Sequence, residues 1–168
     1  MKKPYILYLL TGVFTALIIK FFVLDLMIVN GNSMEPAIKN SRPIIINKLN
    51  YGLVIPFGST TLFQWKKASV NDVVIYLYED KYVVKRCIAT EGMALGYNAC
   101  GNETYEIIIN QKSYPLTRSQ FYRLKDYDSV PEGTIFTIGD NYTDSLDSRV
   151  YGFVPQKNIL GKVLMSSE

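Results

Sequence analysis

One long apolar segment and many short ones make up the hydrophobic pattern of this chain. Apolar residues run from Tyr5 to Ile19 after two lysines and a proline, are interrupted by Lys20, and resume over residues 21–24. A membrane-spanning helix needs roughly 20 residues, which this segment supplies if Lys20 extends its amine to the lipid–water interface. Because the segment is apolar on all sides, it predicts a spanning helix rather than a helix packed on a soluble domain.

A cleavable signal peptide is the competing interpretation of this N-terminus, since it also combines positive charge with an apolar run. Its cleavage site would need small residues, but Phe21-Phe22-Val23-Leu24 follows the run instead. We therefore expect residues 1–24 to form a cytoplasmic tip and a retained single-pass anchor. The lysines before the span predict a cytoplasmic N-terminus, with residues 25–168 on the outer side of the cytoplasmic (inner) membrane.

Beyond the anchor, short runs of branched and aromatic residues alternate with turn-forming residues. Residues 79–81 and 111–112 separate two pairs of such runs and predict hairpins. We find no helical period in residues 30–168. The predicted strands are an extended stretch at 21–29 and runs at 43–47, 73–78, 82–89, 105–110, 114–116, 134–138 and 159–165, with a loop or irregular hairpin at 51–67. The predicted fold class is all-β, a compact domain of many short antiparallel strands behind one N-terminal transmembrane helix.

The composition limits the chemistry that this chain can perform. The 168 residues allow one domain and a short anchor. They include no histidine and two cysteines, which excludes a Ser-His-Asp triad, a Cys-His pair and a zinc site built on these ligands. We expect no metal and no cofactor, so a hydrolytic base must be Lys, Asp, Glu or Tyr. A dispersed net charge of +3 does not indicate nucleic-acid binding, and nothing in the pattern indicates an oligomeric state.

The two cysteines, Cys87 and Cys100, lie outside any recognisable cysteine motif. Two interpretations remain open. They are either buried small hydrophobic residues, or they form one disulfide, which a domain outside the cytoplasm permits.

Lys85 lies in an unusual sequence environment for a lysine on a strand. Alternation places it on one face with Val83, Cys87 and Ala89, whereas surface strands place lysine among polar residues. Burial lowers the pKa of a lysine amine, and a neutral amine can take a proton from a serine hydroxyl. A lysine that protects a strand edge against aggregation would have a similar local sequence.

Ser33 follows the anchor closely and lies in a turn between Gly31 and Pro36. A glycine at this position allows the backbone to approach a substrate closely. Taken alone, the segment also fits an ordinary turn serine.

Three segments together resemble the type I signal peptidases, serine proteases that use a Ser-Lys dyad. They occur in that family's order behind an N-terminal anchor, and the absence of histidine agrees with a Ser-Lys dyad. The matching motifs are Gly31-x-Ser33-Met34-x-Pro36, Lys85-Arg86, and a third segment with Gly139-Asp140-Asn141, Ser145-x-Asp147-Ser148-Arg149 and Gly152-x-Val154-Pro155.

The resemblance implies that Ser33 attacks the scissile carbonyl and that Lys85 is its general base. The backbone N–H of Ser33 would contribute to the oxyanion hole. Some family members add a serine hydroxyl two residues before the nucleophile, where this chain has Gly31. Ser145 corresponds to the serine that orients the lysine amine.

The resemblance also implies supporting roles for residues around the dyad. Asp147 and Arg149 correspond to an ion pair beside the site. The residues expected to hold or shape the surrounding loops are Asp140, Asn141, Met34 and Pro36.

The implied activity is the removal of signal peptides from exported preproteins after small residues, by an endopeptidase domain formed by residues 25–168. Preprotein signal peptides and the lipid bilayer are therefore the expected partners. Small substrate pockets would be formed by apolar side chains, for which Phe22, Leu24 and Ile28 are the candidates.

Departures from the family pattern leave the substrate range open. Residues 89–93 replace the Pro-Gly-Asp turn that normally follows the Lys-Arg motif, and Ala37-Ile38 replaces Thr-Leu. The alternatives are a peptidase dedicated to one substrate class, such as a pilin or a secretion-system component, and an inactive relative that binds peptides. A self-cleaving repressor would carry a DNA-binding helix-turn-helix, and a penicillin-recognising enzyme needs Ser-x-x-Lys, which the sequence lacks.

Overall fold

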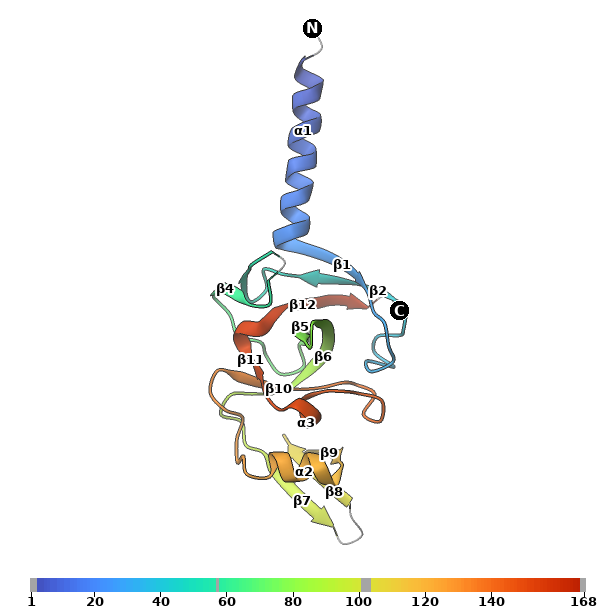
Figure 1. Ribbon diagram of the computed structural model, residues 1–168, viewed down its shortest axis with the longest axis vertical. Helices are drawn as coiled ribbons and strands as arrows, with labels where there is room; N and C mark the ends of the chain where they lie inside the picture. The colour runs from blue at the N-terminus through green and yellow to red at the C-terminus, as the bar shows by residue number, and fades with distance from the viewer. Residues whose placement is uncertain (1–2, 57, 101–103, 167–168) are drawn as a thin grey trace.

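The computed structural model describes residues 3–56, 58–100 and 104–166. Its most prominent feature is a long N-terminal helix that stands away from a β-rich body (Figure 1). Helix α1 (Lys3–Ile18) continues into the π-helical turn η1 (Ile19–Val23). Within the described residues, Tyr5–Val23 is the one helix long and apolar enough to cross a membrane, and the body buries none of it.

A seven-stranded antiparallel sheet organises the body. Its spatial order is β1-β2-β12-β5-β6-β10-β11, so the C-terminal strand lies between strands from the N-terminal half of the chain. The C-terminal strand β12 pairs with β2 on one side and with β5 on the other. The seven strands are β1 (Leu24–Ile28), β2 (Pro43–Asn47), β12 (Ile159–Ser166), β5 (Val73–Tyr78), β6 (Lys81–Thr90), β10 (Thr134–Ile138) and β11 (Val154–Pro155).

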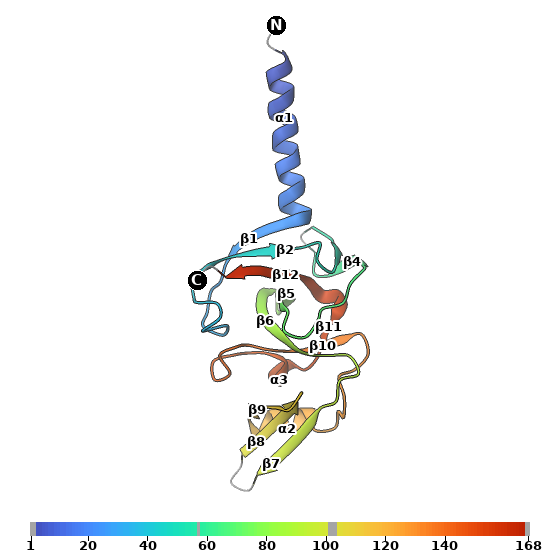
Figure 2. The ribbon, with the colours of Figure 1, turned by 180° about the vertical axis from the view of Figure 1, so that it is seen from behind.

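Two smaller sheets flank this main sheet. The pair β3 (Gly52–Val54) and β4 (Thr61–Gln64) lies at the end of the body nearest the anchor, as both ribbon views show (Figures 1 and 2). The sheet of β7 (Gly96–Cys100), β8 (Thr104–Ile109) and β9 (Lys112–Leu116) lies at the opposite end, next to helix α2 (Arg118–Leu124). A one-turn helix α3 (Ser148–Tyr151) and a 3₁₀ turn η2 (Gln156–Asn158) complete the fold.

The predicted all-β class behind one apolar helix is confirmed. Strands β2, β5 and β10 begin and end where the sequence predicts, and the expected hairpins form at β5–β6 and β8–β9. Left-handed residues make both turns tight: Glu79 and Asp80 in the first, Asn110 and Gln111 in the second. Such two-residue turns match the twist of the strands they join.

The prediction that residues 30–168 contain no helix is wrong. Helix α2 is closed by a capping box, in which the Thr117 hydroxyl accepts from the Gln120 N–H and the Gln120 side chain accepts from the Thr117 N–H. Helix α3 is capped by Asp147, the residue before it, whose carboxylate accepts from the Arg149 N–H. These helices of seven and four residues are too short to show a helical period, so their capping residues are the available signal.

The predicted alternation along β6 fails after Cys87. Cys87 pairs with Thr137 and Ala89 with Phe136, which leaves Ile88 as an extra residue in a β-bulge. Cys87 therefore belongs to the core cluster around Val74 and Tyr76, whereas Ala89 belongs to the cluster around Phe136. The bulge separates Lys85 and Cys87 from Ala89, which the sequence pattern had placed on the same face.

Candidate active site

Ser33 and Lys85 meet although they lie 52 positions apart in the chain. The Lys85 amine donates a hydrogen bond of 2.6 Å to the Ser33 hydroxyl oxygen. Lys85 is 3% exposed, while Ser33 is half-buried. The sequence-predicted nucleophile and base are thus within direct proton-transfer distance.

Burial is the main influence on the Lys85 amine. It lowers the pKa of Lys85 below its ordinary value, because the charged form loses its hydration. The carboxylate of Asp147 opposes this effect and raises the pKa, while the guanidinium of Arg149 adds to the lowering. Since the net direction is downward, the environment favours the neutral amine that a general base requires.

The turn that carries Ser33 is fixed from both sides. Met34 is 1% exposed and packs into the core cluster of β2 and β5, while its carbonyl accepts from the Ile38 N–H at 2.8 Å. Gly31 adopts a φ of 117°, a value that favours glycine, and its N–H donates to Asn40. Pro36, by contrast, is exposed and closes the turn after Glu35. A buried methionine next to the half-buried Ser33 holds this serine at the edge of the core.

The Gly139-Asp140-Asn141 segment of the third motif binds the backbone of the turn that carries Ser33. The Asn141 N–H donates to the Ser33 carbonyl at 3.0 Å, and the Asn141 side chain donates to the Asn32 carbonyl at 3.3 Å. A Cβ at Gly139 would collide with the Ser33 carbonyl and with the Ser145 hydroxyl. Position 139 therefore accepts only glycine, a requirement that the sequence motif alone did not explain.

Ser145 contacts this same region but forms no hydrogen bond. Its hydroxyl oxygen is buried and has no hydrogen-bond partner among the described residues. The predicted bond to the Lys85 amine is therefore not made in this structure, in which that amine donates to Ser33 instead. A buried hydroxyl without a partner is uncommon and calls for an explanation.

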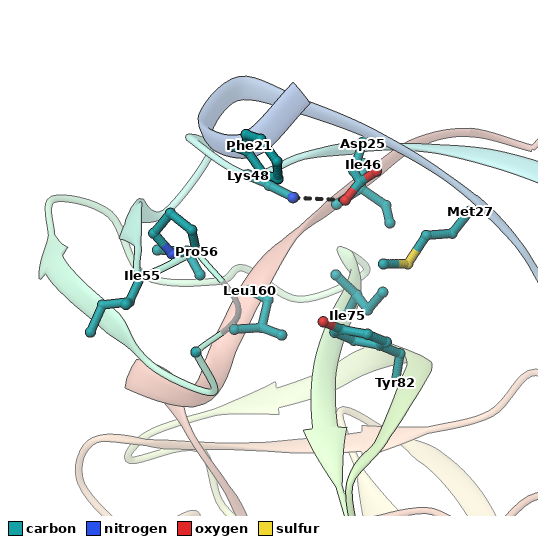
Figure 3. A pocket seen from close by; sticks show the side chains of 12 residues that line it. Phe21, Asp25, Met27, Ile46, Lys48, Ile55, Pro56, Ile75, Tyr82 and Leu160 are labelled. Carbon is teal, nitrogen blue, oxygen red and sulfur yellow. Dashed lines mark ion pairs between the residues drawn. The ribbon is translucent and has the colours of Figure 1, made fainter. Parts of the chain in front are cut away.

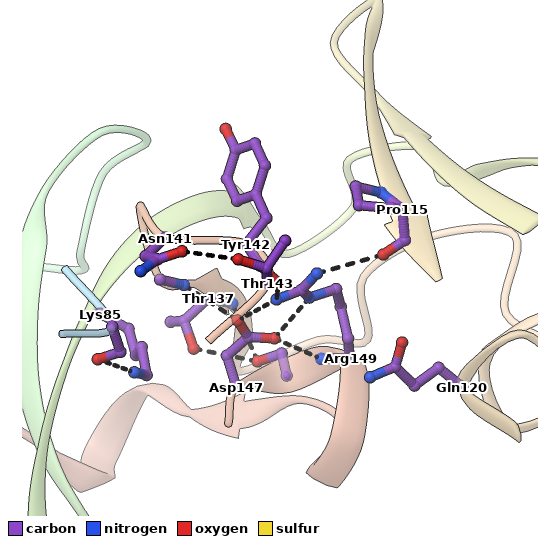
Figure 4. A network of polar contacts seen from close by, with 12 residues as sticks. Lys85, Pro115, Gln120, Thr137, Asn141, Tyr142, Thr143, Asp147 and Arg149 are labelled. Atoms are coloured by element: carbon purple, nitrogen blue, oxygen red, sulfur yellow. Dashed lines mark hydrogen bonds and ion pairs between the residues drawn. The ribbon is translucent and has the colours of Figure 1, made fainter. Parts of the chain in front are cut away.

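The Asp147–Arg149 ion pair is buried beside the dyad (Figure 4). Two hydrogen bonds of 2.9 Å join the guanidinium to the two carboxylate oxygens. Asp147 also accepts from the Gly139 N–H, and Arg149 donates to the carbonyls of Pro115 and Tyr142. The pair thus ties the end of β10 to α3 and to β9, and both of its charges act on the pKa of Lys85.

A second ion pair holds the loop after β10, and sequence reasoning missed one of its members. Arg86 binds the Asp140 carboxylate through two hydrogen bonds of 2.7 Å, and it also donates to the Asn71 carbonyl. Arg86 is part of the Lys85-Arg86 motif, but that motif predicted no role for its side chain. The available signal was its position directly after Lys85. Neighbouring strand residues point to opposite faces, so the Arg86 side chain is expected on the other face of β6 from Lys85.

A groove of about 820 Å³ leads to Ser33 and Lys85. It is lined by the chain from Met27 to Met34, by β6 from Lys81 to Lys85, and by Asp144 and Leu146. Of the three predicted substrate-contacting residues, Ile28 lines this groove, but Phe22 and Leu24 do not. Phe22 lies in η1, at the end of the apolar helix, and Leu24 is the first residue of β1. Both precede Met27, where the lining of the groove begins.

Cys87 carries a free, buried thiol, as expected of a small hydrophobic residue. Burial raises its pKa to about 12, which removes it as a nucleophile. The Cys100 side chain lies outside the described residues. Among the residues that are described, no three His, Cys, Asp or Glu side chains gather into a potential metal site.

A serine hydroxyl bonded to a buried lysine, at the base of an open groove and without histidine, is the arrangement of a serine hydrolase that uses lysine as its base. Comparison with known proteins agrees with this class. The family described as "Signal peptidase, peptidase S26" matches residues 2–167. The chain belongs to this family and is a serine peptidase.

Curated relatives cover most of the chain. Probable signal peptidase I-1 of Synechocystis sp. is 28% identical over 96% of this chain and 80% of its own length. Signal peptidase I of Bacillus caldolyticus is 29% identical over 86% of this chain and 80% of its own length. A crystal structure of a signal peptidase I from Enterococcus faecalis is 27% identical and covers 60% of this chain and 98% of the compared chain, with a TM-score of 0.41.

Proposed function

We propose that this protein is a membrane-anchored signal peptidase that cuts exported preproteins after small residues with a Ser33–Lys85 dyad. The 2.6 Å contact between the Lys85 amine and the Ser33 hydroxyl is the observation that carries the proposal. Burial supplies the second requirement, since it lowers the pKa of the amine. The assignment of this activity to the chain also rests on its family.

In the acylation step, the neutral Lys85 amine takes the Ser33 proton while the hydroxyl oxygen forms a bond to the scissile carbonyl carbon. The Ser33 backbone N–H stabilises the developing oxyanion, to which each such donor contributes about 3–4 kcal/mol. The C–N bond then breaks, and Lys85 donates the proton that it took from Ser33 to the leaving amine. The signal peptide remains attached to Ser33 as an ester.

In the deacylation step, Lys85 takes a proton from water, and the resulting hydroxide attacks the ester carbon. The bond to Ser33 breaks and the serine recovers its proton from Lys85. During this half of the reaction the Ser33 oxygen is esterified and is a poorer partner for the amine. We assign to Ser145 the role of holding the lysine at this stage, because its buried hydroxyl has no hydrogen-bond partner among the residues that the structure describes.

The anchor supports a location at the cytoplasmic membrane, with a single span and the peptidase domain outside. Tyr5–Val23 has the length and composition of a span, and Lys2 and Lys3 precede it. Ser33 lies ten residues after the end of that segment, which would hold the dyad near the bilayer surface where a signal peptide emerges.

Cleavage of a preprotein panel in detergent tests this function. Wild type is expected to cut after small-x-small sequences, and Ser33→Ala and Lys85→Ala are expected to lose the activity. The matched controls Ser113→Ala and Lys112→Ala change exposed residues on β9 and should retain it. Activity retained in Ser33→Ala or Lys85→Ala would eliminate the dyad.

The same panel separates the alternatives. Cleavage confined to one preprotein class, such as a pilin or a secretion-system component, would identify a dedicated peptidase. Binding without cleavage would identify an inactive relative, which the close Ser33–Lys85 contact disfavours. The sequence feature that motivates a narrow substrate range is the segment 89–93, which differs from the Pro-Gly-Asp turn of the family pattern.

A further inference from the structure

The anchor joins the peptidase domain without a linker. Turn η1 ends at Val23, and β1 begins at Leu24, which already has extended geometry (φ −128°, ψ 143°). A trans peptide chain has two soft dihedral angles per residue, so a single residue would leave the angle between helix and strand poorly fixed. Other contacts must therefore define that angle.

Lys48, just beyond β2, supplies these contacts. Its backbone N–H donates to the Val23 carbonyl at 2.9 Å, and its amine donates to the Lys20 carbonyl at 3.3 Å. The same amine forms an ion pair of 2.7 Å with Asp25 on β1. One residue thus binds η1 twice and β1 once.

The carbonyls that Lys48 binds belong to an unusual helix end. In η1 the Leu24 N–H returns to the Ile19 carbonyl, which is the spacing of a π-helix. The last carbonyls of a helix have no partner within it, and leaving them unpaired near a bilayer is costly. Lys48 satisfies two of them. π-Helical turns occur frequently at functional sites, so this junction merits a functional explanation.

The ion pair between Lys48 and Asp25 is shielded from water. The two side chains are 21% and 16% exposed, and they form one wall of a small pocket with Phe21 (Figure 3). Met27 and Tyr82 line both this pocket and the groove that contains Ser33. The junction and the active-site groove are therefore parts of one continuous surface.

Strand β1 is paired with β2 along its whole length, so a rotation at Leu24 turns the whole domain relative to the helix. The five residues of β1 span about 15 Å at roughly 3.3 Å per residue. A rotation of about 20° at Leu24 would therefore displace the far end of β1 by about 5 Å. A substrate anchored in the same bilayer presents its chain at a defined height, so the angle at the junction determines which of its bonds lies beside Ser33.

We propose that Lys48 and Asp25 are positioning residues that fix the height of Ser33 above the bilayer. They thereby select the distance between the apolar segment of a substrate and the bond that is cut. This inference rests on the proposed function, because it needs a substrate held in the same membrane.

The test measures cleavage against spacing, in vesicles that hold the full-length protein and a series of preproteins. The series moves the cleavage site three and six residues further from the apolar segment. Wild type should show a sharp optimum. In Lys48→Met and Asp25→Asn the ratio of cleavage at the displaced site to cleavage at the optimum should rise about 10-fold, because height is no longer fixed. Lys48→Arg, which keeps a side-chain cation for the Lys20 carbonyl and for Asp25, should show the wild-type profile.

Two controls separate positioning from a loss of structure. A short water-soluble peptide does not report height, so Lys48→Met should cleave it within about twofold of wild type. Lys67→Met removes an ion pair with Glu91, away from the anchor, and should leave the spacing profile unchanged. Lys48→Met with a wild-type profile, or with equal losses on peptide and preprotein, would overturn the inference. Wild type that cleaves neither substrate would instead overturn the proposed function.

Discussion

At the scale of single residues, the site depends on a lysine that is placed where its charge is unfavourable. Lys85 is almost fully buried, and burial lowers its pKa. Because the folded-state pKa lies below the unfolded one, the unfolded chain binds more protons between these two values. Burial of the charged amine therefore lowers the free energy of unfolding fully at pH values below the folded-state pKa. This loss disappears as the pH rises towards the ordinary pKa of lysine.

The first prediction follows from the direction of this shift. The kcat/KM for peptide cleavage should rise with pH through the lowered pKa of Lys85 and reach a plateau above it, because only the neutral amine accepts the Ser33 proton. A pH–rate profile between pH 5 and about 10 checks this expectation. A profile that still rises towards a pKa of about 10.4, the ordinary value for lysine, would contradict it.

The second prediction concerns the same amine. Lys85→Met removes the cost of burying an ionisable group while keeping an apolar chain, so it should abolish cleavage and raise the free energy of unfolding at pH 7 by about 1 kcal/mol. Thermal unfolding of the variant in detergent measures the second effect. A lower melting temperature would show that the Ser33 contact stabilises the folded state more than the buried amine destabilises it.

A third prediction separates orientation from catalysis. Ser145→Ala removes a buried hydroxyl that has no partner in the described part of the chain, so the free energy of unfolding should stay equal or rise by up to about 1 kcal/mol. Cleavage should fall by about 10–100-fold, less than in Lys85→Ala, because an orienting contact is lost and the reacting groups remain. Single-turnover kinetics should place the loss in deacylation, and a loss confined to acylation would contradict the role assigned to Ser145.

At the scale of structural elements, regular strands were predictable from sequence and their irregularities were not. Strands β2, β5 and β10 carry branched or aromatic residues between turn residues, and this pattern alone defines them. The bulge at Ile88 leaves no such pattern, because only the pairing with β10 shows it. Helix α2 and the strand β7 were missed for a related reason, since two turns of helix and a strand containing Gly96 give weak periodicity.

The candidate site shows the same division. Ser33, Lys85 and the Asp147–Arg149 pair were identified by motif, and the structure brings them together. The pairing of Arg86 with Asp140 was not predicted, because the motifs that contain these two residues do not show that their side chains meet. Tertiary ion pairs of this kind depend on sheet order, which local sequence does not specify.

The fourth prediction belongs to that ion pair. Arg86→Ala leaves the Asp140 carboxylate, which is 17% exposed, without its bidentate partner. The free energy of unfolding should fall by about 1–2 kcal/mol, and cleavage should fall because the loop after β10 also holds Ser33. Denaturant unfolding and kinetics measure the two effects. Lys125→Ala, which disrupts an exposed pair with Asp126, is the control and should change neither by more than about 0.5 kcal/mol.

At the scale of the whole molecule, the domain is polarised along the axis of the anchor. The β3–β4 pair and the β1–β2 edge lie near the end of the helix, while β7–β9 and α2 lie at the far end (Figures 1 and 2). The groove that contains Ser33 and Lys85 extends to Met27 on β1, the strand that directly follows the helix. Such an arrangement suits a substrate that arrives from the membrane side.

The fifth prediction tests the orientation in the membrane. Protease added to intact spheroplasts should digest residues 25–168, and sealed inverted vesicles should protect them, because the N-terminal lysines favour the cytoplasm. Immunoblotting with an antibody against the domain reads the result. Protection in spheroplasts would reverse the proposed topology.

The position of β12 has a further consequence for how the activity first arises. The last strand of the chain inserts between β2 and β5, so it joins the half of the sheet that leads to Ser33 to the half that carries Lys85. Until β12 has paired with both neighbours, Ser33 and Lys85 belong to parts of the sheet that no strand joins. Ser33 and Lys85 are therefore expected to meet together with the pairing of β12 and not before it.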